Sequence, residues 1–129
     1  MRRSVLLAVA VAVAVLATGC GDEATYSRAK TRACLERNDV RIGGKLDFVA
    51  STATDGAFVA HLDDGNFATV LFGENEGDAE ELESAYHQFA FPNVKEGLPD
   101  VLRRDRNAVL LWHEHPSDDA VAILSDCLK

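Results

Sequence analysis

Motifs that identify an enzyme are missing from these 129 residues. No serine lies in a GxSxG motif, and the chain has neither a glycine-rich phosphate loop nor a pair of catalytic carboxylates. The three cysteines have no CxxC spacing, which argues against a redox-active pair. We therefore expect neither enzymatic activity nor a cofactor.

Basic residues are outnumbered by acidic ones. Lys and Arg total 13 against 21 Asp and Glu, so the formal net charge is −8. A negative domain is repelled by phosphate backbones and by anionic lipid surfaces. We therefore do not expect nucleic acid as a partner.

Long hydrophobic runs are also missing, apart from one short stretch near the start. Arg2 and Arg3 precede the uncharged residues 5–17, which are mainly Ala and Val, and polar residues return at Gly21 and Asp22. A helix that crosses the hydrocarbon core needs ~20 apolar residues, so this stretch is too short. A basic start followed by a short apolar stretch is typical of a cleaved signal peptide, and we predict that residues 1–19 form one.

The end of this stretch, residues 16–20, reads Leu-Ala-Thr-Gly-Cys. It resembles the lipobox of bacterial lipoprotein signal peptides, although Ala17 stands where leucine is commoner. The resemblance implies cleavage between Gly19 and Cys20 and attachment of a diacylglyceryl group to the Cys20 thiol, with palmitate-type acyl chains as the anchor. The alternative is an ordinary secretory signal that is cleaved nearby and leaves Cys20 free.

Lipidation of Cys20 implies a location at the cell membrane, on its extracytoplasmic face. Two long acyl chains hold a small domain stably, whereas one holds it only marginally. The mature chain would start with Cys20 and a short tether, residues 20–24, and would carry 11 basic and 21 acidic residues, a net charge of −10. Residues 25–129 then suffice for one compact domain.

The remaining two cysteines are Cys34 and Cys127. Thiols outside the cytosol tend to be oxidised, and once Cys20 is lipidated these two are the only candidates for pairing. We predict a Cys34–Cys127 disulfide that joins the two ends of the domain. A loop of this length can stabilise the fold by up to ~4 to 5 kcal/mol in the chain-entropy model.

Hydrophobic periodicity and turn residues predict alternating helices and strands. Helices are expected at residues 25–37, 46–53 and 78–89 and from Ser117 onward, and strands at 40–42, 57–62, 66–72, 101–103 and 108–112. Asp78 with Glu81 resembles a capping box. The short strand at 101–103 is expected to pair with the strand at 108–112. Without this strand and the terminal helices, the order is the ferredoxin-like βαββαβ. We therefore predict an α+β two-layer sandwich with a ferredoxin-like core and one added helix at each end.

The domain also resembles small secreted or lipid-anchored actinobacterial proteins. The features that carry this likeness are scattered, namely Cys34 with Leu35, Asn107 before the strand that reaches Trp112, Pro116 with Ser117, and Cys127 with Leu128. The resemblance implies no activity.

One cluster of possible metal ligands follows the strand at 108–112. His113 and His115 are two residues apart, so on an extended chain they project from the same face and could share an ion, with Glu114 between them. A third ligand from His61 is not expected, because the ferredoxin-like order places its strand ~14 Å away at the opposite edge. The alternative is a pair of exposed histidines at the end of a strand.

Two groups of acidic residues have simple structural interpretations. Asp63 and Asp64 precede Gly65 and fit a hairpin turn better than a fragment of a calcium loop. The acidic run from Glu74 to Glu83 surrounds a predicted helix start, where negative charge is stabilising. This run could also attract a basic partner.

Aromatic residues are few, at 7% of the chain. Most are at positions expected to face the core, and the alternative is that some line a groove for a small ligand or a peptide. These are Phe48, Phe58, Phe67, Phe72, Tyr86, Phe89, Phe91 and Trp112.

From all these observations we expect a non-enzymatic, lipid-anchored interaction or structural module that binds an envelope protein. The alternative is a metal- or small-ligand-binding lipoprotein that uses His113, Glu114 and His115.

Overall fold

The computed structural model describes residues 24–129. The predicted signal peptide and Cys20 lie outside these residues. Between Ala24 and Lys129 no helix is both long and apolar enough to span a bilayer. The elements in chain order are α1 (Arg28–Arg37), β1 (Arg41–Ile42), the 3-10 helix η1 (Ala50–Thr52), β2 (Ala57–His61), β3 (Phe67–Phe72), α2 (Glu76–Phe89), α3 (Pro92–Lys95), α4 (Leu98–Val101), β4 (Leu102–Asp105), β5 (Ala108–Trp112) and α5 (Asp118–Cys127).

Side-chain caps set the starts of the three long helices. Ser27, Asn75 and Ser117 each accept a hydrogen bond from the backbone NH three residues further on, which satisfies one of the free NH groups of a first helical turn. The predicted cap at Asp78 is therefore wrong, because Asn75 caps α2 and Asp78 lies inside its first turn. The predicted helix at 46–53 is reduced to the single turn η1.

The strands form one antiparallel sheet in the order β1-β2-β3-β5-β4. This order differs from the predicted ferredoxin-like one, in which the strands at 57–62 and 108–112 occupy opposite edges. In the structure only β3 lies between β2 and β5. The physical reason is β4, which pairs with β5 along Leu102–Asp105 and takes the edge position itself.

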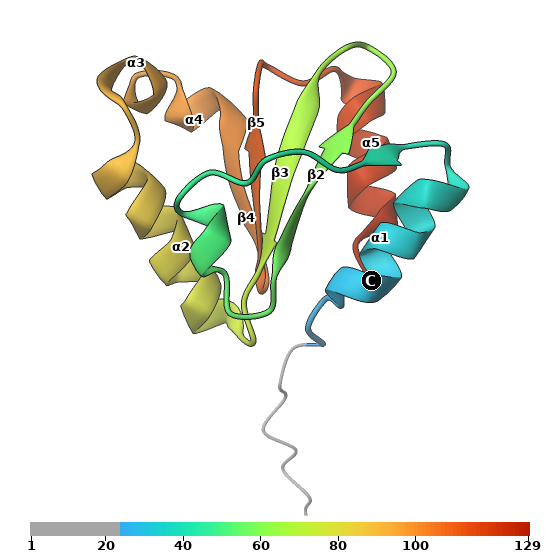
Figure 1. The fold of residues 1–129 in the computed structure, drawn as a ribbon, viewed down its shortest axis with the longest axis horizontal. Helices are drawn as coiled ribbons and strands as arrows, with labels where there is room; N and C mark the ends of the chain where they lie inside the picture. The colour runs from blue at the N-terminus through green and yellow to red at the C-terminus, as the bar shows by residue number, and fades with distance from the viewer. Residues whose placement is uncertain (1–23) are drawn as a thin grey trace, which may run out of the picture.

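The sheet is covered by helices on both faces, so the α+β class is confirmed and the predicted two layers are wrong. Figure 1 shows α1 and α5 on one side of the sheet and α2 on the other. Each face has its own buried cluster, one containing Leu35, Phe72 and Leu124 and the other containing Leu71, Leu82 and Val109. The added terminal helices thus form a third layer rather than extending the layer of α2.

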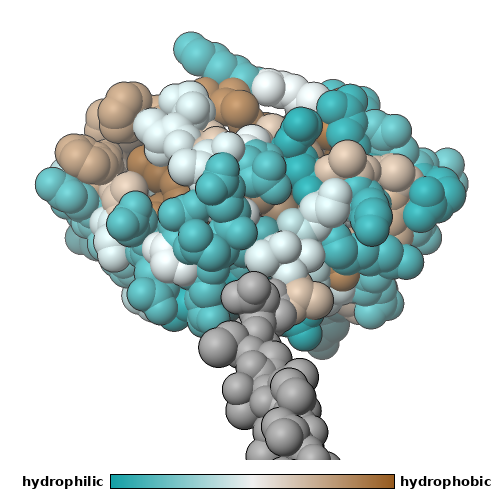
Figure 2. All heavy atoms as spheres, turned by 90° about the horizontal axis from the view of Figure 1, so that it is seen from below, coloured by the Kyte–Doolittle hydropathy of each residue, from teal (hydrophilic) through white to brown (hydrophobic). Residues whose placement is uncertain are grey.

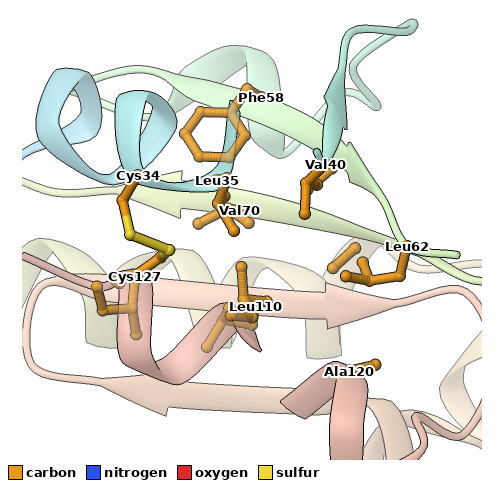
Figure 3. Close-up of a cluster of buried hydrophobic side chains, with 14 of the residues drawn as sticks. Cys34, Leu35, Val40, Phe58, Leu62, Val70, Leu110, Ala120 and Cys127 are labelled. Carbon is orange, nitrogen blue, oxygen red and sulfur yellow. A yellow bond between two sulfur atoms is a disulfide. The ribbon is translucent and has the colours of Figure 1, made fainter. Parts of the chain in front are cut away.

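The predicted Cys34–Cys127 disulfide is present, with the two Cα atoms 5.3 Å apart. It links the last turn of α1 to the last turn of α5, and both cysteines are buried. Figure 3 shows the bond beside the apolar side chains that these helices share with the sheet, among them Leu35 and Val70. The bridge therefore holds the third layer together.

The start of the domain is held by the buried side chain of Asn107, in the turn between β4 and β5. Its Oδ1 accepts from the backbone NH of Tyr26 (2.6 Å), and its Nδ2 donates to the carbonyl oxygens of Tyr26 (3.0 Å) and Gly73 (2.9 Å). Arg106 adds a guanidinium over the Tyr26 ring, 5.1 Å from its centroid. The chain is therefore fixed to the sheet from Tyr26 onward.

Candidate binding groove

Three phenylalanines expected to face the core are instead exposed. Phe48, Phe89 and Phe91 have 70%, 57% and 76% of their surface accessible. Phe89 ends α2, Phe91 caps α3 and Phe48 lies just before η1, so none of them points into a packed layer. These three positions correct the core prediction and favour the alternative of an aromatic groove.

The exposed rings surround an apolar pocket of about 260 Å³. Phe48 and Phe89 meet edge to face, with their centroids 6.0 Å apart. The remaining apolar lining is Val49, Tyr86, Ala90, Phe91, Val94 and Leu111. Figure 2 shows apolar surface gathered at its upper left, on the α2 side of the sheet. An apolar patch of this kind on a small domain marks a site for a partner or a ligand.

A second pocket, of about 440 Å³, adjoins the first and has a mixed lining. The two pockets share Asp47, Val94 and Leu111, so they form one continuous depression. Lys45 and His113 contribute polar groups to the second pocket. We call the combined depression the aromatic groove, and its walls are residues 45–49 on one side and the end of α2 with α3 on the other.

A hydrogen bond between Asp47 and Tyr86 joins the two walls of the groove. The Asp47 carboxylate accepts from the Tyr86 hydroxyl (2.8 Å) and from the backbone NH of Ala50 (2.8 Å), which starts η1. Burial, and then the negative charge of Asp47, raise the pKa of Tyr86 well above its usual range. Tyr86 therefore remains a hydrogen-bond donor over the whole physiological pH range.

His113 stacks on a neighbouring aromatic ring at the floor of the groove. Its ring lies 4.4 Å from that of Phe67, nearly parallel, and the His61 ring lies 5.7 Å from Phe67. His61 also forms a hydrogen bond through Nε2 with the carbonyl oxygen of Gly43 (2.7 Å). The strand order thus brings His61 and His113 to two sides of one ring, whereas the sequence predicted opposite edges of the sheet.

The predicted metal-ligand set of His113, Glu114 and His115 is not assembled. His115 pairs through Nδ1 with Asp100 (2.6 Å), while His113 stacks on Phe67. The backbone NH and carbonyl of Glu114 bond to the Asn66 side chain. Within residues 24–129, no group of three or more His, Cys, Asp or Glu side chains is placed to hold a metal ion.

The acidic groups have the structural roles that the sequence indicated, with additions. Asp64 accepts from the NH of Asn66 within the hairpin turn and also from the hydroxyl of Ser117. In the acidic run, three carboxylates of α2 lie 3.2 to 3.6 Å from the guanidinium of Arg104 on the neighbouring strand β4. They are Glu76, Glu80 and Glu83. Glu81 is exposed beside η1, where it lines a crevice with Thr52 and Asp78.

Sequence reasoning missed Lys45, Asp47 and Val94 as groove residues. Lys45 and Asp47 belong to a segment predicted to be partly helical, and Val94 to a segment predicted to be a loop. The signal for the groove in the sequence was Phe89 and Phe91 shortly before Pro92, because the proline marks a helix end, beyond which side chains are less covered.

Comparisons of the chain with protein-family models, with curated proteins and with solved structures found no match.

Proposed function

We propose that this protein is a bacterial lipoprotein, held through Cys20 at the extracytoplasmic face of the cell membrane, that binds another envelope protein in its aromatic groove. The observation that carries the binding role is the exposure of Phe48, Phe89 and Phe91 around one pocket. Aromatic side chains are enriched at protein interfaces and dominate their binding energy.

Two observations support the location. The sequence around Cys20 resembles a lipobox, and the domain contains a buried disulfide between Cys34 and Cys127. Structural disulfides persist in oxidising compartments and are rare in the cytosol. A disulfide and an export signal are therefore consistent with one another.

Protein binding is favoured over capture of a small molecule by the shape of the groove. Clefts and cavities for small ligands bury about 70 to 90% of the ligand surface. Phe48, Phe89 and Phe91 are each more than half exposed, so the groove is too open to enclose a small molecule in this way. An open groove with exposed aromatic side chains instead suits a segment of a partner protein.

The test combines membrane fractionation with site-specific cross-linking in intact cells. Wild-type protein should sediment with membranes, and Cys20→Ala should lose the acyl mass. A photo-reactive residue in place of Phe91 should cross-link to one envelope protein, whereas the same residue in place of Val121, which is exposed on α5 at the other face, should not. Membrane attachment of Cys20→Ala with an intact leader would refute the lipid anchor. Equal cross-linking from both positions would refute the groove as the binding site.

A further inference from the structure

An acidic crevice lies along α2, N-terminal to the part of the helix that lines the aromatic groove. This crevice lies between η1 and α2 and is lined by Thr52, Thr54, Asp78 and Glu81, with Leu82 and Ala85. Ala85 lies one helical turn before Phe89, and Glu81 one turn before Ala85, so the three occupy one side of the helix. The crevice and the groove therefore follow one another along α2, and we call the strip of surface between α2 and residues 45–54 that holds both of them the seam.

Charge differs between the two ends of this seam. At one end Glu81 is an exposed carboxylate, and Asp78 beside it accepts from the Thr54 hydroxyl and the NH of Glu74. At the other end Lys45 lines the mixed pocket, next to an Asp47 carboxylate that already accepts two hydrogen bonds. The apolar pocket of Phe48 and Phe89 lies between them.

The distance along the seam follows from helix geometry. Glu81 and Phe89 are eight residues apart on α2, which corresponds to about 12 Å at ~1.5 Å per residue. A bound segment would therefore need a cationic side chain roughly 12 Å from its apolar side chain to reach both. That separation corresponds to two helical turns of a partner helix, or to about four residues of an extended chain.

We propose that the seam binds an apolar and basic segment of a partner protein, with an aromatic or large aliphatic side chain in the Phe48–Phe89 pocket and a Lys or Arg at Glu81. This inference rests on the proposed function and specifies the chemistry of its partner. Complementary charge at one end sets the direction of the segment, because Lys45 at the other end repels a basic group. The overall negative charge of the protein speeds the approach of such a partner.

The test is a selection of short random peptides displayed on phage against the purified protein with its disulfide intact. We expect the recovered peptides to combine an aromatic or large aliphatic residue with Lys or Arg. Phe48→Ala should weaken binding of a recovered peptide by about 30-fold, the size expected for a buried aromatic contact. Glu81→Gln should weaken it by a smaller factor, and Glu81→Lys should shift the selection to acidic peptides.

Matched controls lie on α5 at the other face of the sheet. Ile123→Ala removes an apolar side chain that is 36% exposed, and Asp126→Lys reverses an exposed charge; neither should change peptide binding. Circular dichroism of each variant checks that the fold is retained.

Four outcomes would overturn the proposal. They are selection of peptides without basic residues, failure to select any peptide, peptide binding that is unaffected by Phe48→Ala, and sedimentation of the protein as a dimer that Phe91→Glu dissociates, which would make a second copy the occupant. Recovery of acidic peptides is a case of the first outcome and would overturn this inference, whereas the cross-link from position 91 would still support the proposed function.

Discussion

Tyr86 belongs both to the hydrophobic core and to the wall of the aromatic groove. Its ring is buried in the α2 layer, and its hydroxyl reaches Asp47 in the wall of the groove. Because Asp47 also accepts a hydrogen bond from the NH of Ala50, the first residue of η1, the Tyr86 hydroxyl connects the hydrophobic core with the wall of the groove.

Tyr86 predicts a pH dependence of stability at the alkaline end. Its pKa is raised in the folded state, so above the ordinary value of about 10 the unfolded chain releases this proton while the folded chain keeps it. The unfolded state then binds fewer protons, and the free energy of unfolding decreases as pH rises. Tyr86→Phe should lower stability by about 1 kcal/mol near neutral pH through loss of one hydrogen bond, and its stability should decrease less steeply above pH ~10.

Urea unfolding at a series of pH values measures both effects. Tyr26 and the lysines are present in both proteins, so their contributions cancel in the comparison. Parallel stability curves for the two proteins from neutral to alkaline pH would contradict the role given to the Tyr86 hydroxyl.

At the scale of elements, the third layer depends on the covalent link between its two helices. Residues 34 and 127 are separated by 93 positions, and a crosslink over such a loop stabilises a domain by up to ~4 to 5 kcal/mol in the chain-entropy model. We expect the double variant Cys34→Ser, Cys127→Ser to lose about 2 to 5 kcal/mol of unfolding free energy, measured by urea denaturation.

Wild-type protein in the presence of a reductant is the matched control for this variant. It should unfold at the same urea concentration as the double variant, and a thiol assay on the unfolded chain should gain two free thiols on reduction. A midpoint that does not respond to reductant would show that the packing of α1 on α5 holds this layer without the bridge.

The strands β2, β3 and β5 show what the sequence could and could not predict about the fold. Their positions were predicted to within one residue, because apolar runs bounded by turn residues are a strong local signal. The prediction of two layers was wrong, although the sequence carries a signal for the third. Residues 108–112 read Ala-Val-Leu-Leu-Trp, and a continuous apolar run is typical of a strand that is buried on both faces.

The strand order was not predictable in the same way. The strand at 101–103 and its pairing with the strand at 108–112 were predicted, and β4 confirms the pairing. The order was wrong because this strand was left out of the ferredoxin-like core, whereas β4 occupies the edge of the sheet beside β5. Pairing between strands is a long-range property that local propensity does not encode. The error carried over to the candidate site, since the distance between His61 and His113 was inferred from the wrong order.

The binding groove was only partly predictable for a similar reason. The aromatic residues were visible in the sequence, but their exposure depends on where α2 ends and where residues 45–49 cross the sheet. Phe89 fits the apolar stripe of the predicted helix at 78–89 and yet is 57% exposed, because it occupies the last position of α2. Helix periodicity gives the face of a side chain and does not tell how far the covering layer extends.

At the scale of the whole molecule, the proposed anchor and the fixed start of the domain together limit its height above the bilayer. Ala24 is four positions after Cys20, which corresponds to at most ~14 Å of extended chain. From Tyr26 onward the chain is bound to the turn between β4 and β5. That end of the sheet therefore lies close to the headgroups in the proposed lipoprotein.

Charge decides whether the domain itself adheres to this nearby surface. Residues 24–129 contain 11 basic and 19 acidic residues, a net charge of −8, and repulsion from anionic lipids acts over a Debye length of ~10 Å in 0.1 M salt. Of the basic residues at this end, Arg106 already stacks on Tyr26. We therefore expect attachment to depend on the acyl chains alone.

A chain that begins at Ala24 tests this expectation, since it keeps every element of the fold described above. It should remain in the supernatant when phosphatidylglycerol vesicles are sedimented at low salt, whereas the lipidated protein should sediment with them at any salt concentration. Sedimentation of the truncated chain that is lost at high salt and in Arg106→Gln would instead mean that the domain binds anionic headgroups directly. Because attraction between opposite charges is screened by salt and acyl insertion is not, the salt dependence alone separates the two modes of attachment.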